Sequence, residues 1–167
     1  MKQFLVALIV LCSPIIVFSQ DISGLWTGSM FNDQTKQSQH YEVFIAKEKG
    51  KFLGYSETWF VVNETLCYSI KKLKIHIAKN GKIVMQDGEL VTHNFPVAPD
   101  KNVEQLNVLD MFSFDNDIVM DGPFATQQTK KYSALTGRIH VKKVLASNQS
   151  SLINYLNNYN NDVTIAQ

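Results

Sequence analysis

Apolar and polar residues alternate along most of this chain. In the segment 66–78, Leu73 and Ile75 occupy alternate positions, and Lys72 and Lys74 lie between them. Alternation with a period of two is typical of a strand with one buried face. Segments with this alternation, or rich in aromatic and β-branched residues, predict eight strands at 26–31, 41–45, 52–62, 66–78, 83–91, 106–114, 118–120 and 132–145.

Turn signals separate these segments. Asn80-Gly81 is the strongest of them, because both residues tolerate the positive φ of a tight hairpin. Further turns are predicted at 47–51, 115–117 and 121–123. Eight short strands joined in this way predict an all-β domain, either an antiparallel sandwich or a barrel.

The first residues have a different character. Lys2 precedes an almost wholly apolar run at 4–18, and Val17 and Ser19 stand where small residues precede a cleavage site. This order is typical of a secretory signal peptide, and the run is short for a membrane span. We therefore expect residues 1–19 to be a signal peptide and the mature chain to start at Gln20, or at Asp21 as second choice. The protein would then be periplasmic or secreted.

The remaining chain divides into a barrel domain at 20–146 and an Asn- and Ser-rich tail at 147–167. Within the tail, Leu152, Tyr155, Leu156 and Tyr159 recur at helical spacing after Ser150-Ser151. Two outcomes are consistent with this pattern: a short C-terminal helix, or a disordered tail.

Composition narrows the classes of partner. Apolar residues make up 45% of the chain and charged residues 19%, and the formal net charge is +1. This near-neutral balance predicts no nucleic-acid binding, and no later stretch is apolar enough for a membrane span. Cys12 lies in the expected signal peptide, so Cys67 would be the only cysteine of the mature chain. We expect no internal disulfide.

Two short motifs near the ends of the domain resemble the calycin barrels, the family of lipocalins and avidins. The first is 22–27, Ile-Ser-Gly-Leu-Trp-Thr, and the second is 136–140, Thr-Gly-Arg-Ile-His. In calycins a Gly-x-Trp opens the first strand, and a basic residue of the last strand packs over that Trp. The chain also looks like uncharacterised exported β-barrel proteins of Bacteroidota.

The resemblance implies an antiparallel up-and-down β-barrel of about eight strands, with a barrel-closing pair formed by Trp26 and Arg138. A guanidinium over an indole face is a favourable contact. Avidins have Asn where this chain has Gly28, and their Trp-rich later strands are absent here. Biotin binding is therefore not implied. Lipocalin-like proteins hold varied apolar ligands inside the barrel.

No motif for catalysis emerges, and we expect no catalytic residues, no metal site and no cofactor. The four histidines lack metal-ligand spacing, and Cys67 has no His partner in sequence. The basic cluster of Lys71, Lys72 and Lys74 is interpreted as a solvated strand face.

Two functions are consistent with this sequence. The first is an exported, non-enzymatic binding protein that holds a small apolar or amphipathic ligand inside the barrel. Small residues in the third and fourth strands would leave a gap for that ligand. The residues expected to bind it are Phe44, Phe52, Tyr55, Ser56, Trp59 and Tyr68. The alternative is an interaction module with a filled barrel, which binds a protein or glycan partner through its surface.

Overall fold

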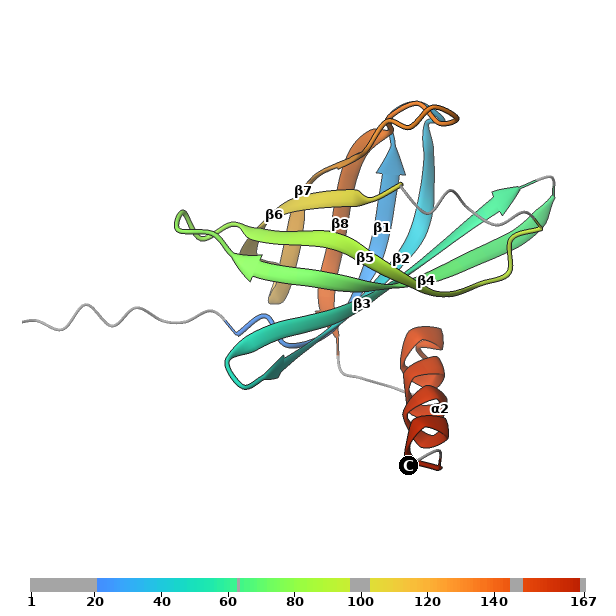
Figure 1. The fold of residues 1–167 in the computed structure, drawn as a ribbon. Helices are drawn as coiled ribbons and strands as arrows, with labels where there is room; N and C mark the ends of the chain where they lie inside the picture. Colours follow the sequence, from blue (N-terminus) through green and yellow to red (C-terminus); the bar gives the residue numbers. More distant parts are fainter. Residues whose placement is uncertain (1–20, 63, 97–102, 145–148, 166–167) are drawn as a thin grey trace, which may run out of the picture.

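Eight antiparallel strands form a closed barrel, followed by one helix (Figure 1). The computed structural model describes residues 21–62, 64–96, 103–144 and 149–165, so the expected signal peptide lies outside the described residues. The elements are β1 (Gly24–Asn32), β2 (Gln37–Glu48), β3 (Lys51–Val62), β4 (Thr65–Ile77), β5 (Ile83–His93), β6 (Gln105–Phe114), β7 (Asp117–Thr126), β8 (Thr136–Val144) and α2 (Ser151–Ile165).

The topology confirms the predicted fold class. Each strand pairs with its neighbours in sequence, and β8 returns to β1 to close the barrel. In this closing ladder Trp26 lies opposite Lys143, and Gly28 lies opposite Val141. An added Cβ at Gly28 would lie 2.1 Å from the carbonyl oxygen of His140, so only glycine permits so close an approach of the two strands.

Short turns at one end of the barrel follow the sequence signals. In the β2–β3 turn, Lys49 and Gly50 have φ of 48° and 81°, and in the β6–β7 turn Asp115 and Asn116 have φ of 47° and 69°. Two consecutive positive φ values are typical of the hairpin turns that match strand twist. This end is called the turn end below. The opposite end, which carries the β1–β2, β3–β4, β5–β6 and β7–β8 connections, is called the loop end.

One predicted turn was wrong. Asp121-Gly122-Pro123 does not end a strand, because β7 runs on through it to Thr126. Pro123 is exposed, on the outer side of the strand. The β6–β7 pairing is interrupted between Asn107–Phe124 and Asp110–Asp121. Proline has no N–H to donate to the ladder, so the strand accommodates it where the pairing lapses.

Large apolar side chains fill much of the barrel interior, and on β1, β7 and β8 they extend toward the loop end. They come from alternate positions of the strands: Trp26, Met30, Val43, Ile45, Leu73, Ile75, Ile83, Met85, Leu109, Met120, Phe124, Ile139 and Val141. Ile22, just before β1, is also completely buried, and its carbonyl accepts a 2.9 Å hydrogen bond from Nε1 of Trp26. Burial of this apolar surface is the main source of stability for a small domain.

The predicted barrel-closing pair is half wrong. Trp26 is fully buried, but the side chain of Arg138 is 66% exposed and pairs with Asp121 on the outside of the barrel. The cation over the indole is Lys143, whose Nζ lies 5.6 Å from the ring centroid. Ile139, Val141 and Lys143 share the inner face of β8, whereas Arg138 falls on the outer face.

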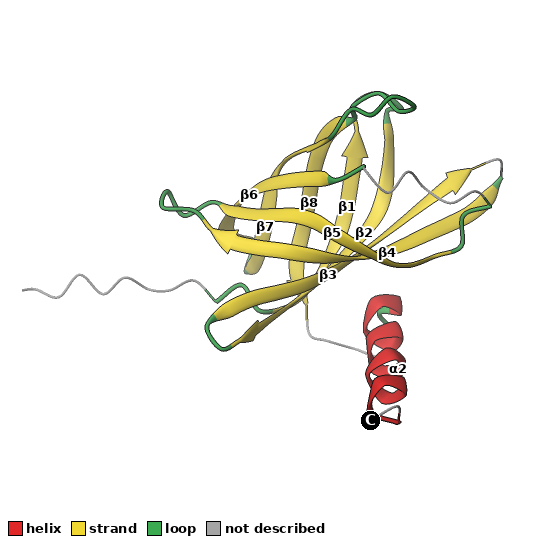
Figure 2. Ribbon diagram, viewed as in Figure 1, coloured by secondary structure: helices red, strands yellow, loops and turns green. Residues whose placement is uncertain are grey.

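The C-terminal tail forms a helix rather than a disordered segment. Figure 2 shows α2 to one side of the strands. Its residues Leu152 and Leu156 pack with Ile70 on the outer face of the barrel. At the helix start, the Oγ of Ser150 accepts a hydrogen bond from the backbone N–H of Ile153 at 3.1 Å. This contact is an N-cap, as the Ser-Ser pattern predicts.

Candidate functional site

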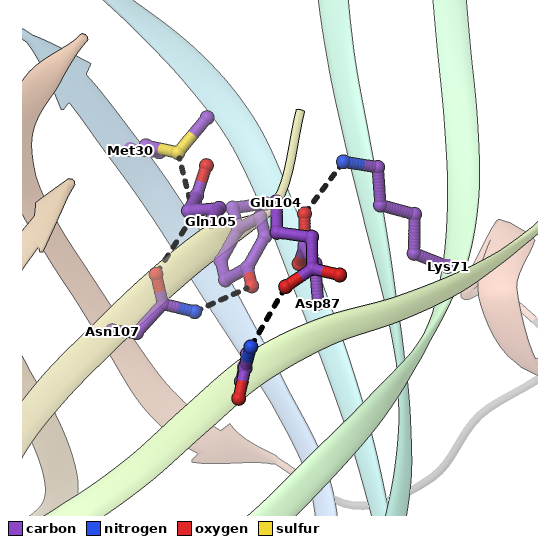
Figure 3. Close-up of polar contacts among 8 residues, drawn as sticks. Met30, Lys71, Asp87, Glu104, Gln105 and Asn107 are labelled. Carbon is purple, nitrogen blue, oxygen red and sulfur yellow. Dashed lines mark hydrogen bonds and ion pairs between the residues drawn. The ribbon is translucent and has the colours of Figure 1, made fainter. Parts of the chain in front are cut away.

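A cluster of polar side chains from β2, β4, β5 and β6 occupies part of the barrel interior, beside the apolar core. Its centre is an ion pair between Lys71 of β4 and Asp87 of β5, with Nζ and Oδ2 2.5 Å apart (Figure 3). The side chain of Asp87 is only 5% exposed, and that of Lys71 is 27% exposed. Solvent therefore reaches the lysine but hardly the carboxylate.

A chain of neutral hydrogen bonds lies in the same interior. Asn107, which is fully buried, donates from Nδ2 to the hydroxyl of Tyr41 at 3.4 Å. Its Oδ1 accepts from Nε2 of Gln105 at 2.8 Å, and that amide also lies 3.5 Å from the sulfur of Met30. We call Tyr41, Lys71, Asp87, Gln105 and Asn107 the interior polar cluster.

Burial shifts the pKa values of two members of this cluster, Asp87 and Tyr41. It raises the pKa of Asp87, and the nearby positive charge of Lys71 opposes part of that rise. Burial and the Asp87 carboxylate together raise the pKa of Tyr41, so its hydroxyl stays protonated. The cluster thus offers amide and hydroxyl groups beside one ion pair whose charges offset each other.

Aromatic rings lie on the same inner face, closer to the loop end. The register places Phe60 two positions beyond Thr58 on the inner face of β3, and His93 opposite Ser69 of β4. The ring of Phe95 lies 5.0 Å from that of Phe60 and 4.9 Å from that of His93. Nδ1 of His93 accepts a hydrogen bond from the backbone N–H of Phe95, so in its neutral form this imidazole carries its proton on Nε2.

The six residues predicted to bind a ligand do not share one face. Phe52 and Ser56 lie on the inner face of β3: Phe52 packs against the core, and Ser56 is buried opposite Val43 and Lys71. Phe44, Tyr55 and Tyr68 lie on the outer face, in the apolar cluster that also holds Leu152 and Leu156 of α2. Trp59 stacks on Tyr68 there, with ring centroids 5.4 Å apart.

The gap expected at the small residues is largely filled. A Cβ added to Gly54 would lie 2.5 Å from Cδ1 of Ile75, so the isoleucine already occupies that space. Ser56 and Ser69 are both buried. The space at Gly54 is therefore already filled, whereas Ser56 lies beside the interior polar cluster, opposite Lys71.

Sequence reasoning missed the interior polar cluster because it grouped Lys71 with its basic neighbours. Lys71 has the same parity as Leu73 and Ile75, and Asp87 has the same parity as Ile83 and Met85. A charged residue in register with an apolar face is the signal that could have identified both.

Other candidate groups form no comparable site. Cys67 is a buried free thiol. His140 is on the surface, with Nδ1 2.9 Å from Asp121. Among the described residues, no group of three or more His, Cys, Asp or Glu side chains is placed to hold a metal ion. Within the same residues, no helix is long and apolar enough to cross a membrane.

Comparisons with models of protein families, with curated proteins and with solved structures found no match to this chain.

Proposed function

We propose that this protein is an exported, non-enzymatic binding protein that takes a small amphipathic ligand inside the loop end of its barrel. The observation that carries this proposal is the buried Lys71–Asp87 ion pair beside the Tyr41–Asn107–Gln105 chain. Perturbed, buried polar groups that converge in one interior are where binding sites are expected.

Stability alone gives a weak reason for such an ion pair. Removing two charges from water costs several kcal/mol per ion, and apolar residues of similar volume often stabilise a fold as well or better. Leu73 and Met85, the next inward positions of β4 and β5, follow that rule. A role in recognition accounts for a charged pair at Lys71 and Asp87 next to these apolar positions.

The chemistry of the interior favours an amphipathic ligand over a purely apolar one. Lys71 is reached by solvent, so a polar ligand group can contact its ammonium and the neighbouring amides. Phe60, His93 and Phe95 supply an apolar wall nearer the loop end. The apolar side chains that fill the rest of the interior limit the ligand to a small molecule.

Native mass spectrometry of the protein purified from its own source tests this proposal. We expect the natural protein to carry an added mass from a bound ligand. The Lys71→Met/Asp87→Asn double variant should lack this added mass. This variant removes both charges together and leaves no unpaired buried charge. The matched control is Lys72→Met/Glu89→Gln, which removes an exposed ion pair of the same two strands, with Nζ and Oε2 2.9 Å apart.

The control should retain the added mass. No added mass in the natural protein, or equal loss in both double variants, would contradict an interior site. Nile red supplies a second readout, because its fluorescence rises in apolar surroundings and falls when a bound ligand displaces it.

A further inference from the structure

The pairing of β2 with β3 stops before either strand ends. Its last pair toward the loop end is His40 with Trp59. Beyond this pair, residues 37–39 of β2 continue along β1, and residues 60–62 of β3 continue along β4. In Figure 1 the β3–β4 hairpin projects away from β1 and β2 at the right of the view. The unpaired edges of β2 and β3 therefore diverge from the His40–Trp59 pair.

A cleft of about 410 Å³ lies between the diverging strands. One wall is polar and comes from β2. The other wall is apolar and comes from β3 and β4. The lining residues are Gln37, Ser38, Gln39, His40, Trp59, Phe60, Val61 and Leu66. No Asp, Glu, Lys or Arg is among them.

The apolar wall is exposed to an unusual degree. Val61 and Leu66 pair across β3 and β4, and they are 64% and 53% exposed. Trp59 and Tyr68 form the next pair on the same outer face. Exposed strand edges normally carry charges, above all Lys, that prevent pairing with another chain. Neither diverging edge has such a charge at 37–39 or 60–62.

We propose that this cleft binds an extended, uncharged segment of a partner protein, which adds as a strand to the edge of β3. Among the described residues, no strand pairs with that edge beyond Trp59. An added strand would satisfy its backbone groups and place apolar side chains against Val61 and Leu66, the arrangement of strand addition. The absence of charged lining residues disfavours a charged segment, because its desolvated charges would meet no opposite charge.

This site shares Phe60 with the apolar wall proposed for the interior site, and its other lining residues are different. Lys71 and Asp87 lie inside the barrel, whereas Val61 and Leu66 lie on the outer face of the projecting hairpin. Variants at Val61 and Leu66 leave the Lys71–Asp87 ion pair in place, and Lys71→Met/Asp87→Asn leaves the cleft lining in place, so each proposal can fail without the other.

Selection from a displayed library of short linear peptides, followed by fluorescence polarisation with a labelled selected peptide, tests the cleft. We expect selected peptides to be uncharged and rich in Val, Ile and Thr, with an affinity that changes little with salt. Val61→Lys should weaken binding by at least about tenfold, and Leu66→Lys should do so independently. Phe114→Lys is the matched control, because Phe114 is 61% exposed but belongs to the β6–β7 hairpin.

N-methylation of the peptide backbone separates strand addition from simple apolar contact. Methylation at alternate residues should abolish binding in one register and preserve it in the other, because only alternate N–H groups face the edge of β3. Peptides that bind Val61→Lys as well as the natural protein, or that tolerate methylation in both registers, would overturn the proposal. So would self-association that depends on Val61 in the absence of any peptide, or binding of neutral oligosaccharides in place of peptides.

Discussion

Lys143 closes the barrel over Trp26 because it has the right parity in β8. Ile139 and Val141 point inward, and position 143 is the next inward position. The ammonium also donates a 3.2 Å hydrogen bond to the carbonyl of Asp21, just before the first strand. Lys143 thus links the last strand to the residues that enter β1.

Substitutions of Trp26, Lys143 and Arg138 should differ widely in their effect on the free energy of unfolding. Trp26→Ala should lower the free energy of unfolding by about 3–5 kcal/mol, because it empties the centre of the turn end. Lys143→Ala should cost about 0.5–1 kcal/mol through the lost cation–π contact. Arg138→Ala should change stability by less than about 0.5 kcal/mol, since its side chain is mostly solvated. Urea unfolding measures all three, and an effect of Arg138→Ala larger than that of Lys143→Ala would reverse this assignment.

Ser56→Phe places a large ring on the inner face of β3, opposite Val43 and Lys71. We expect a loss of about 1–3 kcal/mol from overpacking, together with loss of interior ligand binding. The comparison is Thr58→Phe, two positions closer to the loop end on the same face. If Ser56→Phe folds and binds an interior ligand as well as the natural protein does, the interior polar cluster is not the binding site.

The alternation of apolar and polar residues gives the inner and outer faces of β4 and β8 as the structure has them. The same alternation places Lys71 on the inner face of β4, where the interior polar cluster lies. Arg138 was assigned by resemblance to a calycin pair, against its own parity with His140. Phe44, Tyr55 and Tyr68 were assigned to the interior because they are aromatic. Their outward placement depends on a helix far along the chain, which covers them. Local patterns carry no information about that tertiary contact.

Two carboxylates from adjacent strands anchor α2. Glu42 and Glu57 pair directly across β2 and β3, and both are buried. Ser150 donates from Oγ to Glu42 at 2.7 Å, and Ser151 donates to Glu57. The backbone N–H of Leu152 points to Glu42 at 3.4 Å. The positive end of the helix dipole thus lies over two negative groups, which favours docking.

Glu57 makes the stability of the protein depend on pH. Burial raises its pKa above the ordinary value of 4.5, although the hydrogen bond from Ser151 lowers it in part. The folded protein therefore binds this proton more tightly than the unfolded chain does. Its stabilising contribution is complete below pH 4.5 and is lost as the pH rises through the raised pKa. Glu57→Gln should flatten this decline in urea unfolding at a series of pH values, and a decline unchanged in Glu57→Gln would assign it to another group.

The sequence predicts that each strand is present more completely than it predicts the residues at which each strand begins and ends. All eight strands were expected, and the tight turns lie at the expected residues. β7 is longer than predicted because Gly122-Pro123 has the composition of a turn but lies where the β6–β7 pairing lapses. The helix at 151–165 was one of two expectations, since its docking depends on Glu42 and Glu57, which come more than 90 residues earlier.

The barrel as a whole holds together without a covalent cross-link. Cys67 is free and buried. The barrel domain should therefore melt at the same temperature with and without a thiol reductant, as measured by circular dichroism. A lower melting temperature under reducing conditions would show that a disulfide, internal or between chains, contributes to stability.

The pairing between β5 and β6 determines how the closed barrel would come apart. These strands share four paired positions, from Ile83–Leu109 to Gln86–Leu106, whereas β1 and β2 share nine. Asp87 follows immediately after the last of the four. The barrel thus has few strand pairs beside the buried carboxylate of Asp87. Amide protons along 83–86 should exchange with solvent sooner than those of β1, and a pulling force across the barrel should tear this seam first, which exposes the interior polar cluster while the rest of the sheet stays joined.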